Sequence, residues 1–163
     1  MTTSPTLDAS FSPPPGLHPF TRIHCEVGAV HSLGAAPLGE RRYVPLQGGR
    51  VLGPELNGRI VDGGVDWQIA RADGVLEIDA HYVIEAEDGA RIEVRSQGLR
   101  CGPPEVMDRL ARGEDVPADA YYFRTAVRLT TGAPAWAHLN RLLVLASGRR
   151  QARSVWLELW RVG

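Results

Sequence analysis

The chain has 163 residues, of which 44% are hydrophobic and 23% are charged, as in one ordinary globular domain with a substantial core. Its formal net charge is −1, so no overall field favours nucleic acid or an anionic membrane as a partner. All 18 basic residues are arginine, which excludes Schiff-base chemistry, a phosphate-loop lysine and a lysine general base.

The first 19 residues are rich in Ser, Thr and Pro and lack the basic and apolar segments of a secretory signal. We therefore expect a flexible tail at 1–19 and a single domain at 20–163. No apolar run approaches the roughly 18–20 residues that a membrane helix needs. Without an export signal, Cys25 and Cys101 are expected to be reduced thiols of a cytoplasmic protein.

After the tail, the sequence divides into short runs separated by turns that contain glycine, among them Gly48-Gly49, Asp73-Gly74 and Asp88-Gly89. This spacing predicts antiparallel strands at 21–31, 41–47, 56–61, 65–71, 75–86, 90–98, 121–130, 139–147 and 153–162. Prolines before it and Gly113 after it predict a short helix at 103–112. Because closure removes exposed strand edges, we predict an all-β fold. It is a closed antiparallel β-barrel of about 8–10 strands with one short helix near 104–112.

The turn at Asp73-Gly74 admits two registers, which differ in where they place Asp66. A two-residue loop pairs Ile69 with Ile78 and leaves Asp66 on the polar, outer face. A three-residue loop, 72–74, puts Asp66 on the inner face close to Tyr82, where burial would raise the carboxyl pKa. The apolar pattern favours the first register.

The turn at Asp88-Gly89 has a better-defined register. A two-residue loop would set Ile84 against Glu93 and mix the apolar and polar faces of the two strands. A three-residue loop, 87–89, pairs Ile84 with Ile92 and Glu85 with Arg91. The pattern therefore predicts the three-residue loop, with Gly89 in the left-handed region.

An ordered set of short motifs runs through the chain: Gly63-Gly64-Val65-Asp66-Trp67, Asp79-Ala80-His81-Tyr82, Glu87-Asp88-Gly89-Ala90, Gln97-Gly98, Tyr122-Phe123-Arg124-Thr125 and Trp136-Ala137-His138-Leu139-Asn140. From about Phe20 to the C-terminus, this set resembles the bacterial and fungal family of domain of unknown function 3237, DUF3237, also called UPF0311. The resemblance implies a compact antiparallel β-barrel. It supplies no single activity, but its Gly-Gly-x-Asp-Trp motif draws attention to Asp66.

Several kinds of site are not predicted. His24 and Cys25 are adjacent and would point to opposite faces of a strand, and no Cys-x-x-Cys, His-x-His or His-Glu-x-x-His motif exists. A Gly-x-Ser-x-Gly motif is also absent. The glycine-rich segment 48–53 has no helix start after it and no phosphate-loop lysine. We therefore expect neither a metal nor a cofactor.

Polar and aromatic residues within the predicted strands remain as candidates for a ligand pocket. In such a pocket, a guanidinium would bind a carboxylate or oxyanion, a tyrosine would donate a proton and a carboxylate would act as base. The candidate catalytic residues are Asp66, Tyr82 and Arg124. The candidate ligand-binding residues are Trp67, Tyr122, Trp136, Asn140 and Glu158.

Strand aromatics also cover sheet surfaces in proteins without any pocket, and an arginine that alternates with apolar residues usually faces solvent. Two functions therefore stay open. The first is a cytoplasmic barrel that binds a small, partly apolar organic acid or ketone, with acid/base catalysis of isomerase or lyase type. The second is a non-catalytic binding or oligomeric protein whose barrel is filled by its own side chains. An internal cavity above about 300 Å³ would favour the first.

Overall fold

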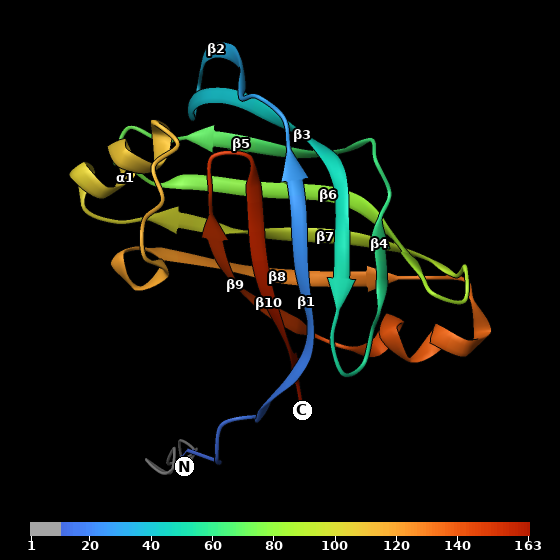
Figure 1. The fold of residues 1–163 in the computed structure, drawn as a ribbon. Helices are drawn as coiled ribbons and strands as arrows, with labels where there is room; N and C mark the ends of the chain where they lie inside the picture. The colour runs from blue at the N-terminus through green and yellow to red at the C-terminus, as the bar shows by residue number, and fades with distance from the viewer. Residues whose placement is uncertain (1–10) are drawn as a thin grey trace, which may run out of the picture.

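A computed structural model of the chain, which describes residues 11–163, contains ten strands and few helical turns (Figure 1). The part of the predicted tail at 1–10 lies outside the described residues. The strands are β1 Leu17–Val27, β2 His31–Ala36, β3 Gly39–Leu52, β4 Gly58–Ile60, β5 Gly64–Ala70, β6 Leu76–Ala86, β7 Arg91–Cys101, β8 Tyr122–Thr130, β9 Val144–Arg150 and β10 Ser154–Val162. The helical segments are α1 Pro104–Ala111 and the 3₁₀ helices η1 Ala118–Ala120 and η2 Pro134–Arg141.

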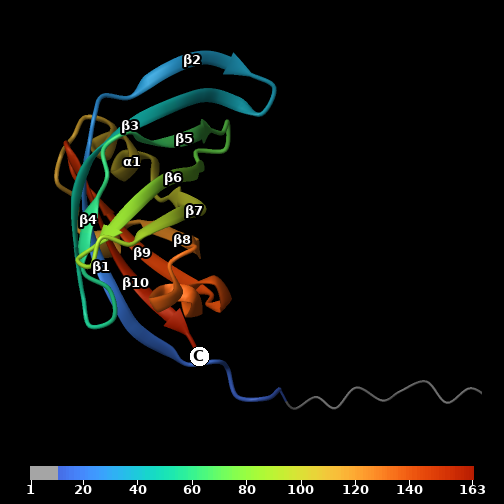
Figure 2. The same cartoon turned by 90° about the vertical axis from the view of Figure 1, so that its right-hand side faces the viewer.

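The strands form one antiparallel sheet that closes on itself, which confirms the predicted barrel. Its order runs β1-β10-β9-β8-β7-β6, then through β5 and β4 to β3, and β3 pairs again with β1. The first half of β3 pairs with β5 and the second half with β4 and β1. The β2–β3 hairpin extends beyond the barrel wall (Figure 2).

The turn predicted at Gly48-Gly49 is wrong, because both glycines lie inside β3. Gly48 has a φ of +99°, and a Cβ on Gly49 would lie 2.0 Å from the carbonyl oxygen of His24. The two glycines therefore let β3 approach β1 closely at the point where it leaves β5 for β4.

Other element boundaries also differ from the predictions. β2 was not expected, because only its first residue, His31, lay in a predicted strand. β1 begins at Leu17 and ends at Val27. Residues 139–141, expected to begin a strand, belong to η2, whose first residue Pro134 suits a helix start. β7 and β9 continue past their predicted ends at 98 and 147, to Cys101 and Arg150.

The inner face of the barrel changes character along its length. The end near η2 is apolar and closely filled, by fully buried side chains that include Phe20, Ile84, Ile92, Leu139 and Leu159. Towards the other end, where α1 lies (Figure 1), the inner face carries the buried polar side chains of Gln68, Ser96, Arg100 and Thr125. Apart from Thr21, which bonds to the carbonyl of Leu56, the buried polar side chains of the described residues therefore gather in one half of the barrel.

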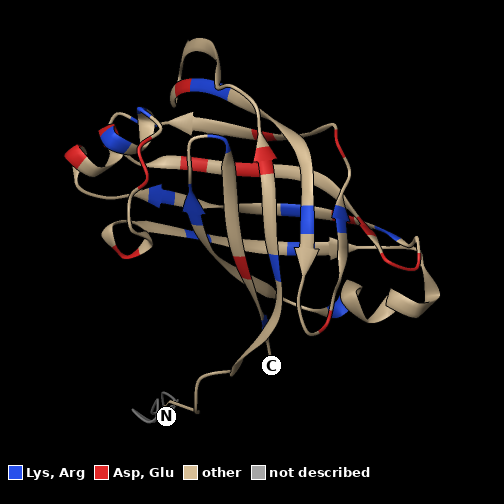
Figure 3. Cartoon of the chain, in the orientation of Figure 1, with Lys and Arg blue, Asp and Glu red and all other residues tan. Residues whose placement is uncertain are grey.

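The charged residues of the strands and loops include both signs, and neither sign gathers on one face in the view of Figure 3. Within residues 11–163, no helix has the length and apolar character needed to cross a membrane. Cys25 and Cys101 are free thiols, and Cys25 faces the barrel interior.

The hairpin between β6 and β7 has the predicted register. Ile84 lies opposite Ile92 and Glu85 opposite Arg91, and Gly89 has a φ of +84°. The amide of Gly89 donates to the carbonyl of Ala86 at 2.9 Å, which closes the three-residue loop.

Gly89→Ala is expected to cost about 1 kcal/mol of unfolding free energy, because a Cβ is disfavoured in the left-handed region. The added methyl group meets no atom within 4 Å, so the loss comes from backbone strain alone. Urea unfolding measures it. Gly132→Ala is the matched control, because Gly132 also has open space around it and no positive φ. Equal stability of the two variants would show that the loop does not depend on the conformation of Gly89.

Candidate functional site

The hairpin between β5 and β6 turns Asp66 into the barrel. The amide of Arg71 donates to the carbonyl of Val75 at 2.9 Å, so the loop contains three residues, 72–74. Asp66 consequently pairs with Ala80 and Gln68 with Ile78, which places both polar side chains on the inner face. The two-residue register favoured by the apolar pattern is wrong. The alternative with Asp66 inside is the one that forms.

Neighbouring side chains fix the Asp66 carboxylate in position. Gln68 Nε2 donates to Asp66 Oδ2 at 2.6 Å, and Arg42 Nε donates to Gln68 Oε1 at 3.0 Å. Because a guanidinium can only donate, it fixes which end of the Gln68 amide faces Asp66. The residue Asp66 as a whole retains some exposure, but its Oδ1 is buried and accepts no hydrogen bond.

Tyr82 supplies a second unpartnered polar atom. Its side chain is 5% exposed, and its hydroxyl is buried with no hydrogen-bond partner. A Cβ on Gly64 would lie 2.5 Å from the Cβ of Tyr82, so glycine at that position of β5 makes room for the tyrosine. The Gly-Gly-x-Asp-Trp motif thus provides both the inward carboxylate and the space for Tyr82.

Asp66 and Tyr82 line the same internal cavity, of about 50 Å³. Asp66 contributes a buried acceptor atom and Tyr82 a buried hydroxyl, and neither has a hydrogen-bond partner among residues 11–163. The remaining wall is partly apolar, with Ile23, Val44, Ile78, Phe123 and Leu157, and partly polar, with Cys25, Gln68, Ser96, Thr125, Arg100 and Arg150. Ser96 and Thr125 satisfy each other through a 2.8 Å hydrogen bond.

Two arginines from the ends of β7 and β9 complete the polar wall. Arg100 is 9% exposed, its Nε lacks a partner, and its guanidinium lies 5.8 Å from the ring centroid of Phe123. The space for that ring exists because a Cβ on Gly148 would lie 2.4 Å from Phe123 Cδ1. Arg150 is half-buried and reaches only the carbonyl oxygens of Ser154 and Ala152, each at 3.4 Å.

Burial sets the protonation states in this half of the barrel. Loss of solvent raises the pKa of Asp66 to about 6, against the opposing effects of the Gln68 hydrogen bond and the Arg100 charge. Burial also lowers the pKa of Arg100 to about 10 and raises that of Cys25 to about 12. Cys25 is therefore a neutral thiol, and burial raises the pKa of Tyr82 as well, which keeps its phenol protonated.

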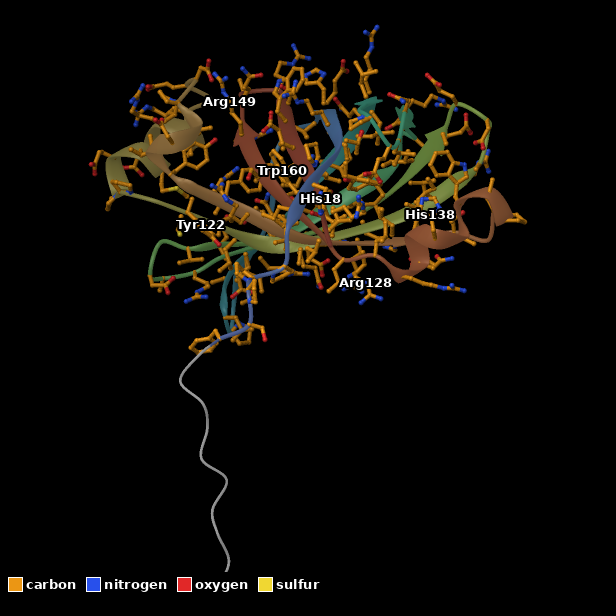
Figure 4. The ribbon with its side chains drawn as sticks, turned by 90° about the horizontal axis from the view of Figure 1, so that it is seen from below. His18, Tyr122, Arg128, His138, Arg149 and Trp160 are labelled. Atoms are coloured by element: carbon orange, nitrogen blue, oxygen red, sulfur yellow. The ribbon has the colours of Figure 1, made fainter. Side chains whose placement is uncertain are left out.

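Arg124 and Tyr122 do not reach this cavity, contrary to the prediction of a shared pocket. β8 alternates strictly, with Phe123 and Thr125 facing inward, so Tyr122 and Arg124 lie outside. Arg124 stacks over Tyr122 at 5.5 Å and donates to the carbonyl of Phe123. Figure 4 shows Tyr122 and Arg128 on the outside of the barrel.

Trp67 and Glu158 also face outward. Trp67 follows the inward Asp66, so it points to the opposite face, where Tyr43 and Arg41 pack against its ring. Glu158 forms an ion pair with Arg22 at 3.2 Å in a surface groove along β1 and β10. Neither side chain lines the cavity.

Trp136 and Asn140 hold the loop around η2 in place. Trp136 Nε1 donates to Asp88 Oδ2 at 2.8 Å, which ties η2 to the β6–β7 hairpin. The Asn140 side chain bonds to both the amide and the carbonyl of Thr131. Neither residue lines the cavity. Of the eight predicted site residues, the structure therefore brings together two, Asp66 and Tyr82.

Arg100 and Arg150 escaped the sequence analysis because the predicted strands ended too early. The inner face that begins at Ile92 and Val94 continues through Ser96 to Arg100 when β7 is extended by three residues. The same extension of β9 carries the inner face from Ala146 to Arg150. The sequence pattern that could have revealed them is a polar residue at the next inward position of a strand whose other inward residues are apolar. Among residues 11–163, no group of three His, Cys, Asp or Glu side chains forms a candidate metal site.

Comparison with known proteins identifies the relatives of this chain. Residues 15–162 match the family described as "Protein of unknown function (DUF3237)". The UPF0311 protein RPA1785 of Rhodopseudomonas palustris is 37% identical over 140 residues, covering 86% of this chain and 92% of that protein. Its crystal structure superposes with a TM-score of 0.90 at 35% identity, over 93% of this chain and 100% of the other.

Two further similarities are informative. A β-barrel like protein from Acinetobacter baumannii has a TM-score of 0.80 at 34% identity, over 94% of this chain and 100% of that one. The hydroalkoxylation enzyme phnH of Penicillium herquei is 43% identical over 49 residues, 30% of this chain and 32% of the enzyme. A crystal structure of an enzyme from the same fungus shares the fold, with a TM-score of 0.72 at 22% identity over 95% of this chain and 99% of the other.

The raised pKa of Asp66 predicts a pH-dependent loss of stability. The folded state holds a proton on this carboxyl up to about pH 6, whereas the unfolded chain releases it near 3.8. Protonated Asp66 therefore contributes its full stabilisation below pH 3.8. This contribution, about 2–3 kcal/mol of unfolding free energy, is lost as the pH rises to 6. Urea unfolding measures the unfolding free energy of the wild type and of Asp66→Asn from pH 4 to pH 6.5. The wild-type value minus the Asp66→Asn value should fall as the pH rises. A flat difference would mean that the carboxyl titrates normally.

Arg100→Met is expected to stabilise the protein by about 1 kcal/mol, because it removes a buried charge that has no ion-pair partner among residues 11–163. Arg128→Met is the matched control on the outer face of β8 and should change stability by less than about 0.5 kcal/mol. Thermal and urea unfolding compare them. Marked destabilisation by Arg100→Met would show that the guanidinium supports the fold.

Proposed function

The chain belongs to the DUF3237 family, and on this premise we propose that it binds a small, partly apolar organic molecule in the polar half of the barrel. There it catalyses proton transfer of isomerase or lyase type. The observation that carries the proposal is the pair of unpartnered atoms, Asp66 Oδ1 and the Tyr82 hydroxyl, that line one cavity. As part of this proposal the protein acts in the cytoplasm, where Cys25 and Cys101 stay reduced.

Asp66 is the proposed acid/base group. As carboxylate it takes a proton from a carbon next to a carbonyl group, and as carboxylic acid it returns the proton to another atom of the same molecule. A pKa of about 6 makes both states accessible near neutral pH. The Arg42–Gln68–Asp66 hydrogen-bond chain keeps the carboxylate aimed at the cavity while the proton moves.

Tyr82 is the proposed oxyanion donor. Its raised pKa keeps the phenol protonated, so the hydroxyl donates a hydrogen bond to the oxygen on which negative charge develops. Enclosure within the barrel strengthens this bond, because little water competes for either partner. The donor and the base come from neighbouring strands, β5 and β6, so their spacing is set by the sheet.

The phnH relative supports this class of chemistry. Hydroalkoxylation adds an O–H group across a carbon–carbon double bond, and acid/base groups can carry out such an addition without a redox cofactor. The reverse of an addition is an elimination, which is lyase chemistry. The inner face described here offers an acid/base carboxyl and a hydroxyl donor for a reaction of that kind.

A second function is favoured by the size of the cavity. About 50 Å³ is well below the roughly 300 Å³ of typical ligand sites, so the barrel as it stands accepts only a few atoms. This favours a non-catalytic protein with a filled barrel. The proposed function requires the cavity to widen, and we assign this to the Arg150 side chain, which is half-buried and held by two long contacts.

The test is hydrogen–deuterium exchange on small carbonyl compounds. Acetone, cyclohexanone and pyruvate are incubated with the full chain in deuterated water, and NMR follows the loss of protons next to the carbonyl group. The rate should rise with pH through about 6, as Asp66 becomes a carboxylate, and Asp66→Asn should lower it about 100-fold or more.

Asp119→Asn is the matched control, because Asp119 is exposed and lies in η1, outside the cavity lining. It should exchange at the wild-type rate. Equal rates for the wild type and Asp66→Asn with all three compounds would contradict the catalytic proposal and favour the filled, non-catalytic barrel.

A further inference from the structure

The two arginines of the cavity wall lack the acidic partners that buried guanidinium groups normally have. Within residues 11–163, neither Arg100 nor Arg150 forms an ion pair, whereas the strand arginines Arg22, Arg59 and Arg95 are examples that do. Arg100 is 9% exposed and its Nε has no hydrogen-bond partner. A buried cation without a counterion is costly, so an arginine kept in this state indicates a partner outside residues 11–163.

The charges around the cavity are unbalanced in favour of an anion. Its wall contains two guanidinium groups, of Arg100 and Arg150, and one carboxylate, of Asp66. Arg42 adds a third cation nearby, and its charge lowers the pKa of both Arg100 and Arg150. The charge of Asp66 acts on both wall arginines, but one carboxylate offsets at most one of these cations.

We propose that Arg100 and Arg150 form a carboxylate-binding site, so that the ligand of the barrel is a small organic monocarboxylate. This inference rests on the proposed function and specifies the substrate class of the same site. A planar carboxylate matches the donor fork of a guanidinium. The small cavity and its partly apolar wall fit a carboxylate carried on a short carbon chain better than they fit a hydrated dianion such as phosphate.

Carboxylate binding at this site also acts on Asp66. The groups that face its carboxyl are Arg42 from β3, Gln68 from β5, Tyr82 from β6, Arg100 from β7, Arg150 from β9 and Cys25 from β1. A bound anion engages the two wall guanidiniums and brings a like charge close to Asp66. Both effects favour the protonated carboxyl, so binding raises the pKa of Asp66.

The experiment compares acetate with acetamide, which has nearly the same shape and no charge. NMR titration with ¹³C-labelled probes at constant ionic strength and pH 7 measures binding to the full chain. Acetate should bind at least about tenfold more tightly than acetamide. Arg100→Met should weaken acetate binding about tenfold or more, and Arg128→Met, on the outer face, should not change it.

Proton uptake gives an independent readout. Acetate binding measured by calorimetry in buffers of different ionisation enthalpy should take up about 0.4 proton at pH 7, as the Asp66 pKa rises by about one unit from its value near 6. Asp66→Asn should bind acetate with no proton uptake. Arg100→Met is expected to fold, because it removes a buried charge, and its thermal unfolding is checked first.

The outcomes separate the two proposals. Equal binding of acetate and acetamide, or acetate binding that Arg100→Met leaves unchanged, would overturn the carboxylate site whatever the exchange assay shows. Arg100-dependent acetate binding without any Asp66-dependent exchange would support the carboxylate site and contradict the catalytic function. Binding without proton uptake would show that the anion lies away from Asp66, which contradicts the site as placed here.

Discussion

The hydrogen bond from the Arg71 amide to the Val75 carbonyl closes a three-residue loop and thereby fixes the register of β5 against β6. Because side chains alternate along a strand, a slip of one residue would move the whole set of β5 side chains to the other face. The observed register carries Asp66 and Gln68 inside and Trp67 outside. The unpartnered acceptor, its hydrogen-bond chain to Arg42 and its proximity to Tyr82 all depend on this loop.

The sequence predicted the closed antiparallel barrel, the helix near 104–112 and the register of the β6–β7 hairpin, because these follow from local alternation and turn chemistry. The register predicted for β5 and β6 was wrong, because pairing Ile69 with Ile78 keeps the apolar side chains of both strands on one face. The two loops are in fact alike: Asp73 and Asp88 each accept a hydrogen bond from the amide two residues later. The shared Asp-Gly turn was a stronger guide than the apolar pattern.

The wrong predictions at the site have one physical origin. A polar residue within a strand is normally assigned to solvent, and that rule holds for Arg124 and Glu158 but fails for Asp66, Arg100 and Arg150. These three lie on an inner face that strand propensity alone assigns to apolar residues. Their burial opposes stability, and departures of this kind tend to occur at functional positions. The conflict between local pattern and position is therefore the feature that points to this half of the barrel as the candidate site.

Asp66 is a buried carboxyl that shares its cavity with Arg100 and Arg150, and burial brings its pKa to about 6. The most direct measurement is the ¹³C NMR titration of the Asp66 carboxyl carbon in the full chain, assigned by comparison with Asp66→Asn. A midpoint near pH 6, the value that burial imposes, would agree with the structure. A midpoint at or below the ordinary value of 3.8 would place the carboxyl in solvent or in an ion pair, and would contradict the account.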